Sequence, residues 1–128
     1  MKLMMFENGA EARLGVVDGE RVTDVAACDP ALPATMIALI ESGADALRTL
    51  SDALANAPDS AKLALADVKP ALPIARPGKF VCVGLNYAAH AAEGGHDIPE
   101  YPSLFPRYNS SLIAAGQPVI RPTVSEQL

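Results

Sequence analysis

A histidine and a glutamate three residues apart are the side chains in this sequence best suited to proton transfer. His90 and Glu93 lie in an alanine-rich stretch that follows a short apolar run. If this stretch is helical, both side chains project from one face. A carboxylate one turn away can hold an imidazole in one tautomer and stabilise its charged form, as a general base requires. Without other signals, however, a histidine on such a helix is more often a surface or hydrogen-bonded structural residue.

The residues around this pair predict a strand followed by a short helix. Phe80 to Val83 are apolar and β-favouring, which is typical of a short buried strand. Asn86 can cap a helix that begins at Tyr87, and two glycines after Glu93 end it. Asn86 and Tyr87 are also candidates to face a pocket. For Asn86 the competing role is the cap, and for Tyr87 it is an apolar anchor.

Composition restricts the classes of function. Half of the 128 residues are hydrophobic and a fifth are charged, so a single globular domain is the default expectation. A net charge of −5 argues against nucleic acid and anionic membrane surfaces as partners. The two cysteines, Cys28 and Cys82, lie far apart and suggest neither a disulfide framework nor a metal motif. With no long apolar segment and no signal-peptide pattern, the expected location is cytoplasmic.

The first third of the chain predicts a small antiparallel sheet of three strands. Residues 2–6, 12–17 and 21–25 are the strands, joined around Asn8-Gly9 and Asp18-Gly19. Asn-Gly and Asp-Gly favour hairpins because such turns need positive φ angles. No cluster of chemistry-bearing residues occurs here, so a scaffold role is the expectation.

Two helices and a proline-rich connector come next. Apolar spacing predicts one helix from Ala34 that ends near Ser42-Gly43, and a second over 44–57 that Pro58 ends. Three prolines within residues 69–78 exclude a helix interior or a central strand, so this segment is interpreted as a connector. We therefore expect a domain of residues 1–75 and a second over 76–128.

The remaining segments predict short extended pieces and no second catalytic cluster. Residues 104–108, 109–113 and 117–121 are interpreted as edge or extended segments. His96-Asp97 follows flexible glycines, so a solvated loop is favoured over a second ligand pair. The lesser alternative is that this pair tunes a lid formed by the helix before it. Ser110-Ser111 lacks a visible base, which argues against a nucleophilic serine.

Several motifs in the second half resemble the fumarylacetoacetate hydrolase family in both order and spacing. The resemblance is strongest from Gly78 onward; a lone His-x-x-Glu would not be specific. The motifs are Gly84-Leu85-Asn86-Tyr87-Ala88-Ala89-His90-Ala91-Ala92-Glu93, Tyr101-Pro102-Ser103-Leu104-Phe105, Arg107, Ser110-Ser111-Leu112-Ile113, Gly116-Gln117-Pro118-Val119-Ile120-Arg121-Pro122 and Val124-Ser125-Glu126-Gln127-Leu128.

The resemblance implies an α+β protein: a small N-terminal β-meander with two helices, then the opening strands and lid helix of a β-rich, truncated catalytic domain. It also implies a homodimer that uses Mg²⁺ or Mn²⁺ and acts on 2-oxo or β-diketo acids. The reactions would be carbon–carbon hydrolysis, isomerisation or decarboxylation, with the metal polarising the substrate. His90 and Glu93 match the pair that activates water or moves a proton. Arg107 matches a basic residue beside the pocket, where many members have lysine. It could bind a substrate carboxylate or serve only as an ion-pair partner.

The sequence departs from the family pattern at its metal site. The family's acidic Asp-Tyr-Glu-x-Glu segment is expected after Leu128, so no metal ligand is assigned within these residues. Ala89 also replaces an aspartate that is common before the histidine. Two interpretations follow: a metal-dependent enzyme whose proton-transfer half is present here, or a catalytically inactive fragment or interaction module. Residues 1–128 alone are expected to show little turnover.

Overall fold

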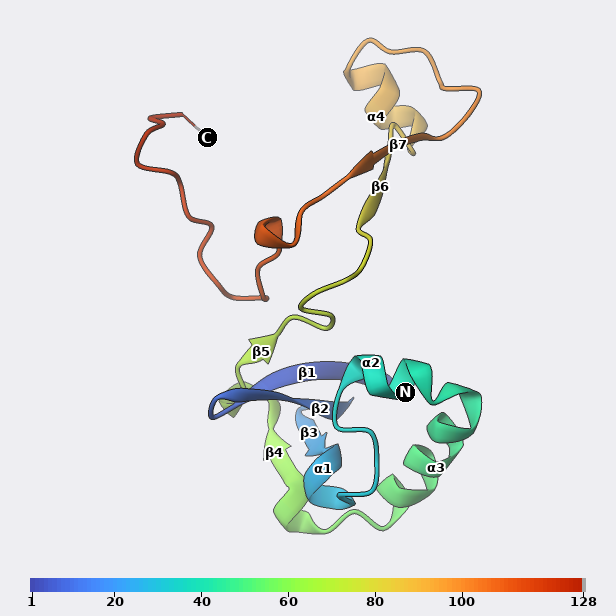
Figure 1. Cartoon of the computed structure of the whole chain (residues 1–128), viewed down its shortest axis with the longest axis vertical. Coiled ribbons are helices and arrows are strands. Elements are labelled where there is room, and N and C mark those ends of the chain that lie inside the picture. The colour runs from blue at the N-terminus through green and yellow to red at the C-terminus, as the bar shows by residue number, and fades with distance from the viewer. Residues whose placement is uncertain (128) are drawn as a thin grey trace. The chain divides into compact units, whose positions relative to one another are not determined.

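The computed structural model describes residues 1–127, which divide into two compact units. The first comprises Met1–Ile74 with the segment from Ile113 onward, and the second is Ala75–Leu112 (Figure 1). No helix among the described residues is long and apolar enough to span a membrane. The assignment of residues 1–75 and 76–128 as separate domains stays a prediction.

The first unit is built on a five-stranded antiparallel sheet with the order β4-β3-β2-β1-β5 (Figure 1). Its centre is the predicted meander of β1 (Lys2–Asn8), β2 (Glu11–Asp18) and β3 (Arg21–Asp24). Both hairpins have two-residue loops, and in each the first loop residue is a glycine with positive φ, 65° at Gly9 and 56° at Gly19. The hairpins inferred from Asn-Gly and Asp-Gly are confirmed.

The two outer strands of this sheet were not predicted. β4 (Lys62–Ala64) pairs with β3, and β5 (Pro70–Ala71) pairs with β1. β5 falls inside the segment interpreted as a connector. Its proline is compatible with pairing because β5 is an edge strand. Two short 3₁₀ turns, η1 (Asp59–Ala61) and η2 (Leu65–Asp67), flank β4.

Three helices accompany the sheet. α2 (Met36–Glu41) and α3 (Gly43–Ala55) confirm the predicted pair, with the break at Ser42-Gly43 where it was expected. The Thr35 hydroxyl caps α2 by accepting a hydrogen bond from the amide of Ala38. α1 (Val25–Cys28) is a single turn that the sequence analysis missed, because β3 had been extended through Val25.

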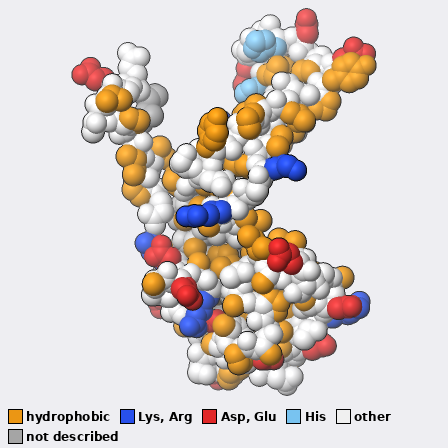
Figure 2. Space-filling view, viewed as in Figure 1, with side chains coloured by type: hydrophobic (Ala, Val, Ile, Leu, Met, Phe, Trp, Pro, Cys, Tyr) orange, Lys and Arg blue, Asp and Glu red, His pale blue; other side chains and the backbone are white. Residues whose placement is uncertain are grey.

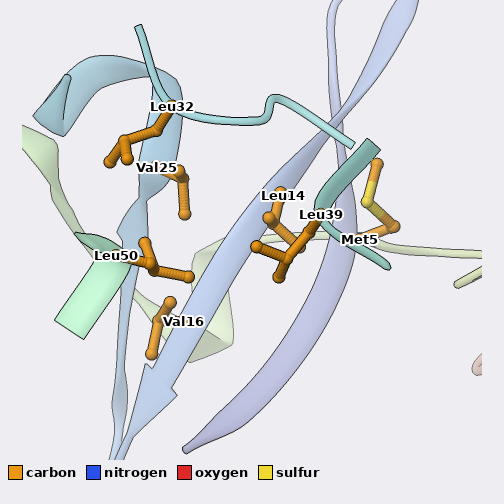
Figure 3. Packing of buried hydrophobic residues seen from close by; sticks show 7 residues of the cluster. All are labelled: Met5, Leu14, Val16, Val25, Leu32, Leu39 and Leu50. Carbon is orange, nitrogen blue, oxygen red and sulfur yellow. The ribbon is translucent and has the colours of Figure 1, made fainter. Parts of the chain in front are cut away.

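The core of the first unit lies between the sheet and these helices. Its buried members come from β1 and β2, from the three helices and from the loop before α2, and Figure 3 shows how they pack together. Leu14, Val25 and Leu50 are fully buried. The cluster comprises Met5, Leu14, Val16, Val25, Leu32, Leu39 and Leu50.

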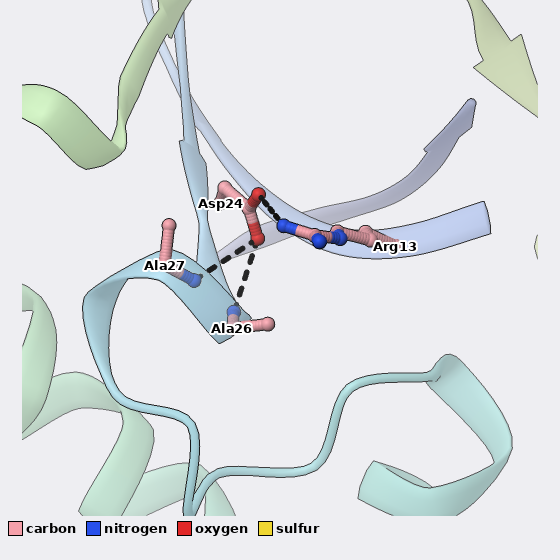
Figure 4. Close-up of polar contacts among 4 residues, drawn as sticks. All are labelled: Arg13, Asp24, Ala26 and Ala27. Carbon is pink, nitrogen blue, oxygen red and sulfur yellow. Dashed lines mark hydrogen bonds and ion pairs between the residues drawn. The ribbon is translucent and has the colours of Figure 1, made fainter. Parts of the chain in front are cut away.

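One buried carboxylate joins β3 to α1. Asp24 is only 6% exposed, and one carboxylate oxygen accepts hydrogen bonds from the amides of Ala26 and Ala27 (Figure 4). Its other oxygen lies 2.9 Å from Nη1 of Arg13. The carboxylate therefore serves as an N-cap and as an ion-pair partner, so a polar group in the core is fully satisfied.

The second unit contains a two-stranded sheet and one short helix. β6 (Val81–Gly84) pairs antiparallel with β7 (Ser103–Pro106), and α4 (Ala88–Glu93) lies between them in sequence. The 3₁₀ turn η3 (Asn109–Ser111) follows β7. The strand, the helix and the edge strand were all predicted, with boundaries shifted by one or two residues.

Three details of the second half differ from the sequence analysis. The strand expected to be buried has both valines about half exposed, because in the described chain nothing covers that face. Residues 109–113 begin with a 3₁₀ turn, and no strand occurs in 117–121. Asn86 does not cap α4: Tyr87 occupies the N-cap position, and no side chain makes a capping hydrogen bond there.

Candidate active site

A strained turn at Leu85 connects β6 to α4 and forms part of the candidate site. Leu85 has a φ of 50°, the one positive value at a non-glycine position among the described residues. Leucine rarely adopts this conformation, and such backbone outliers concentrate at functional sites. After this turn the helix begins at Ala88, one residue later than expected. No sequence signal marked Leu85.

An open groove of about 520 Å³ follows this turn, and His90 is the titratable side chain of α4 that lines it. Its walls come from β6, the turn, the start of α4 and one residue of β7. They are Cys82, Val83, Gly84, Leu85, Asn86, Tyr87, His90 and Phe105. The structure therefore brings together three of the predicted site residues, His90, Asn86 and Tyr87. Cys82 and Phe105 pair across the two strands and form an apolar wall that the sequence analysis did not assign to the site.

Glu93 lies on the same helix as His90, three residues further on, but it does not line the groove. Both side chains are exposed. Among the described residues, no ion pair or hydrogen bond joins them. A solvent-exposed pair at this spacing can close by rotation about side-chain bonds, since residues three apart are neighbours on a helix. The roles predicted for His90 and Glu93 stay predictions.

Arg107 lies beside the groove without lining it. Its guanidinium carbon is 5.5 Å from the ring centroid of Phe105, and its backbone amide donates a hydrogen bond to the carbonyl oxygen of Phe80 (2.9 Å). The cation is therefore anchored on one wall residue of the groove. Its guanidinium makes no ion pair among the described residues, so its donors remain available to an anion.

Two backbone hydrogen bonds connect the segment after α4 to the last turn of that helix. The amide of His96 donates to the carbonyl of Ala91 (2.9 Å), and the amide of Gly95 donates to that of Ala92 (3.1 Å). With Gly95 at a φ of 67°, these two bonds form a Schellman motif. The predicted glycine stop is confirmed. His96 packs over Gly94, while His96 and Asp97 are both exposed, as a solvated loop requires.

A second groove of about 260 Å³ shares the strained turn. Val83 to Asn86 form one wall, and residues 98–102 form the other. That wall consists of Ile98, Pro99, Glu100, Tyr101 and Pro102. The Leu85 turn therefore lines both grooves. The first groove contains the imidazole of His90, and the second contains Tyr101 and the carboxylate of Glu100.

No cluster of three or more histidine, cysteine or acidic side chains able to hold a metal ion occurs among residues 1–127. Both cysteines are free. The described donor set therefore does not fit a divalent metal.

Comparisons with known proteins show which family this chain resembles. A family model described as fumarylacetoacetate (FAA) hydrolase C-terminal matches residues 79–128, the part that begins just before β6. The chain is 35% identical over its whole length to mitochondrial oxaloacetate tautomerase Fahd2a of Rattus norvegicus, and 31% identical to mitochondrial oxaloacetate tautomerase fahd2 of Xenopus laevis. The chain belongs to the fumarylacetoacetate hydrolase family.

The family relationship extends beyond the segment with the clearest motifs. Both tautomerases align with all of this chain, including the meander and helices, whereas the chain spans only 41–42% of their length. A crystal structure of a Mycobacterium smegmatis protein assigned as HpcE covers 84% of this chain, with a TM-score of 0.53 and 24% identity. The chain covers 36% of that protein. This last likeness supports the fold only.

Proposed function

We propose that this chain supplies the proton-transfer part of an enzyme that acts on 2-oxo or β-diketo acids. The observation that carries the proposal is the position of His90, which lines a groove beside a strained turn within the region that matches the family. The reaction would be carbon–carbon hydrolysis, or the related isomerisation or decarboxylation. Two relatives are named oxaloacetate tautomerases, and tautomerisation of a 2-oxo acid is itself a proton transfer.

In this proposal His90 takes a proton either from water or from the carbon beside the substrate carbonyl. Its imidazole is exposed at the groove, and histidine is the side chain that most often serves as a general acid or base. Glu93, one turn further along α4, would close onto the ring and stabilise its charged form once the substrate excludes water. The apolar wall of Cys82 and Phe105 would hold the substrate against the imidazole.

Arg107 would bind the carboxylate of the substrate. Its guanidinium rests against Phe105, which lines the groove, and it has no acidic partner among the described residues. A planar guanidinium matches a carboxylate bidentately, which fixes the orientation of the acid as well as its charge. Asn86 and Tyr87, at the rim of the same groove, would complete the substrate contacts.

A Mg²⁺ or Mn²⁺ ion would need ligands from outside the described residues, because these residues hold no suitable cluster. No step is therefore assigned to a metal here. The same observation favours a second candidate: as a separate polypeptide, residues 1–128 would be an inactive fragment or an interaction module. The protein of which the chain is part would be a cytoplasmic homodimer, although the two tautomerases named above are mitochondrial.

The direct test is turnover by a full-length protein that contains this chain. With Mg²⁺ present, the His90→Ala variant should lose about 10²–10⁴-fold in kcat on acetylpyruvate or oxaloacetate, the range typical of a general base. The affinity for Mg²⁺ should be unchanged in a calorimetric titration. The matched control is His96→Ala, which removes an exposed imidazole outside the groove and should change kcat by less than a factor of about three.

Two results would contradict the proposal. One is normal turnover per bound metal in the His90→Ala variant together with weakened metal binding, which would make His90 a ligand. The other is substantial metal-dependent turnover by residues 1–128 alone, which would show that no further residues are needed.

A further inference from the structure

A pocket of about 480 Å³ opens on the first unit, at the end of the sheet that carries the hairpin between β2 and β3. Its lining comes mainly from β2, β3 and β4, with one residue from α3 and one that precedes β1. The lining residues are Met1, Val16, Val17, Asp18, Arg21, Thr23, Leu54 and Lys62. We call this the first-unit pocket. It shares no residue with the two grooves of the second unit.

The strand register explains why these residues meet. Val16 belongs to the core cluster, so it points to the face of the sheet that the helices cover. Val16 lies opposite Thr23, and Thr23 lies opposite Lys62, so all three share that face. Asp18 and Arg21 pair at the end of the hairpin, and by alternation they share it too. The face that is core in its middle therefore carries charged residues at its end.

Helix α3 ends at the pocket. Leu50 is fully buried in the core, whereas Leu54, one turn later, is only partly buried and lines the pocket. The helix stops at Ala55, one residue further on. On the sheet side, Val16 is 7% exposed. The inner part of the pocket is therefore apolar and continues the core, and its outer part is charged.

The charged residues favour an anion. The lining holds two cations and one carboxylate, in a chain whose net charge is −5. The guanidinium of Arg21 makes no ion pair among the described residues, so its donors are available to a ligand. Lys62 lies 2.9 Å from Asp59, whose side chain is 93% exposed and does not line the pocket. A guanidinium is well matched to a carboxylate, which it can bind bidentately.

The size of the pocket fits a small molecule. Figure 2 shows hydrophobic side chains scattered over the surface of the first unit, so apolar exposure alone identifies no site. The first-unit pocket differs because apolar and cationic residues line one concave volume. Small-molecule sites have volumes of about 300–1,000 Å³ and a few polar groups on a largely apolar lining. An interface with a protein partner would need about 20–30 residues a side.

We propose that the first-unit pocket is a binding site for a small monocarboxylic acid with an apolar tail. The carboxylate binds Arg21 and Lys62, and the tail lies against Val16 and Leu54. Asp18 in the same lining disfavours a second negative charge on the ligand, so a monoanion is preferred to a dicarboxylate or a phosphate. The inference is independent of the proposed reaction, because none of these residues belongs to the second unit.

The test is a titration of residues 1–128 with hexanoate, followed by the backbone amide signals in NMR spectra. Hexanoate should cause saturable shifts at Val16, Thr23 and Leu54, with a Kd of about 1 mM, as expected for a ligand of this size. Acetate lacks the tail and hexylammonium reverses the charge. Each should bind at least about tenfold more weakly than hexanoate.

Substitutions then locate the site. Arg21→Gln should weaken hexanoate binding by about tenfold or more, because a charged donor is lost. Lys62→Met keeps most of the aliphatic stem and should weaken it by about threefold or more. The matched control is Arg48→Gln, which removes an exposed guanidinium of the same unit outside the pocket. It should change the Kd by less than about twofold. The amide spectrum of each variant should retain the signals of the first unit, so that misfolding is recognised.

Four results would overturn the inference. The first is the absence of saturable shifts up to about 20 mM hexanoate. The second is equal affinity for hexanoate and hexylammonium. The third is an equal loss of affinity in Arg21→Gln and Arg48→Gln. The fourth is a set of shifts confined to residues outside the first-unit pocket. None of these results bears on the role of His90, which is tested by turnover.

Discussion

The two units of this chain bury their side chains to very different extents. The first unit has a continuous core of seven buried side chains and a buried carboxylate with all its partners. The second has one buried alanine, a two-stranded ladder and two open grooves. The residues proposed for chemistry lie in the second. The proposed chemistry therefore lies on the unit with the smaller core.

The largest expected effect contrasts a core leucine with an exposed one. Leu14→Ala should lower the free energy of unfolding of the first unit by about 2–5 kcal/mol, because Leu14 is fully buried and a cavity would remain. Leu104→Ala in residues 1–128 should change stability by less than about 0.5 kcal/mol, since its side chain is largely in water. Urea unfolding followed by amide signals of each unit measures both. Similar losses in the two variants would remove the contrast.

A smaller effect separates two strand glycines. A Cβ added to Gly15 would lie 2.5 Å from Cγ1 of Val22 and 3.1 Å from the ring of Phe6. Gly15→Ala should therefore cost about 1–3 kcal/mol through overpacking. At Gly84 the nearest atoms would be 3.6 Å away, an ordinary contact. Gly84→Ala should be nearly neutral in the same unfolding measurement, and equal costs would contradict the difference in packing.

The smallest expected effect concerns a surface ion pair of the first unit. A hydrogen bond and the charge of Lys62 lower the pKa of Asp59 below its ordinary value. When the pKa of a carboxyl group is lower in the folded protein than in the unfolded one, ionisation of that group stabilises the fold. This stabilisation is fully present above the unfolded-state pKa and is lost as the pH falls through the folded-state pKa. Because Asp59 is exposed, this loss should be minor. In Lys62→Met, an NMR titration should show the Asp59 pKa rising toward its ordinary value; an unchanged pKa would show that the pair does not form in solution.

Local signals predicted the elements that local interactions specify. Asn8-Gly9 and Asp18-Gly19 marked both hairpins, and the helices α2 and α3 followed from apolar spacing and the Ser42-Gly43 break. α1, β4 and β5 were missed because each has only two to four residues. Their stability comes from the cap of Asp24 and from pairing with β3 and β1, which no short window of sequence contains.

Only the part of the candidate site that lies in the continuous segment around His90 could be predicted from the sequence. The strand, glycine stop and His90 spacing were visible, and so were Asn86 and Tyr87 at the groove. The wall contributed by Phe105 depends on pairing between residues more than 20 positions apart, which the sequence alone did not fix. The exposure of Val81 and Val83 was missed for a related reason: burial depends on what covers a strand.

Hydrogen exchange in the substrate tests the central claim most directly. In D₂O, a full-length protein containing this chain should exchange the protons on the carbon beside the keto group of oxaloacetate, followed by NMR. His90→Gln keeps the size and polarity of the side chain but removes its basic group, and it should slow this exchange at least about 100-fold. His96→Gln should leave the rate within about threefold of the unsubstituted protein. Equal exchange by the His90→Gln variant and the unsubstituted protein would show that His90 does not carry the proton.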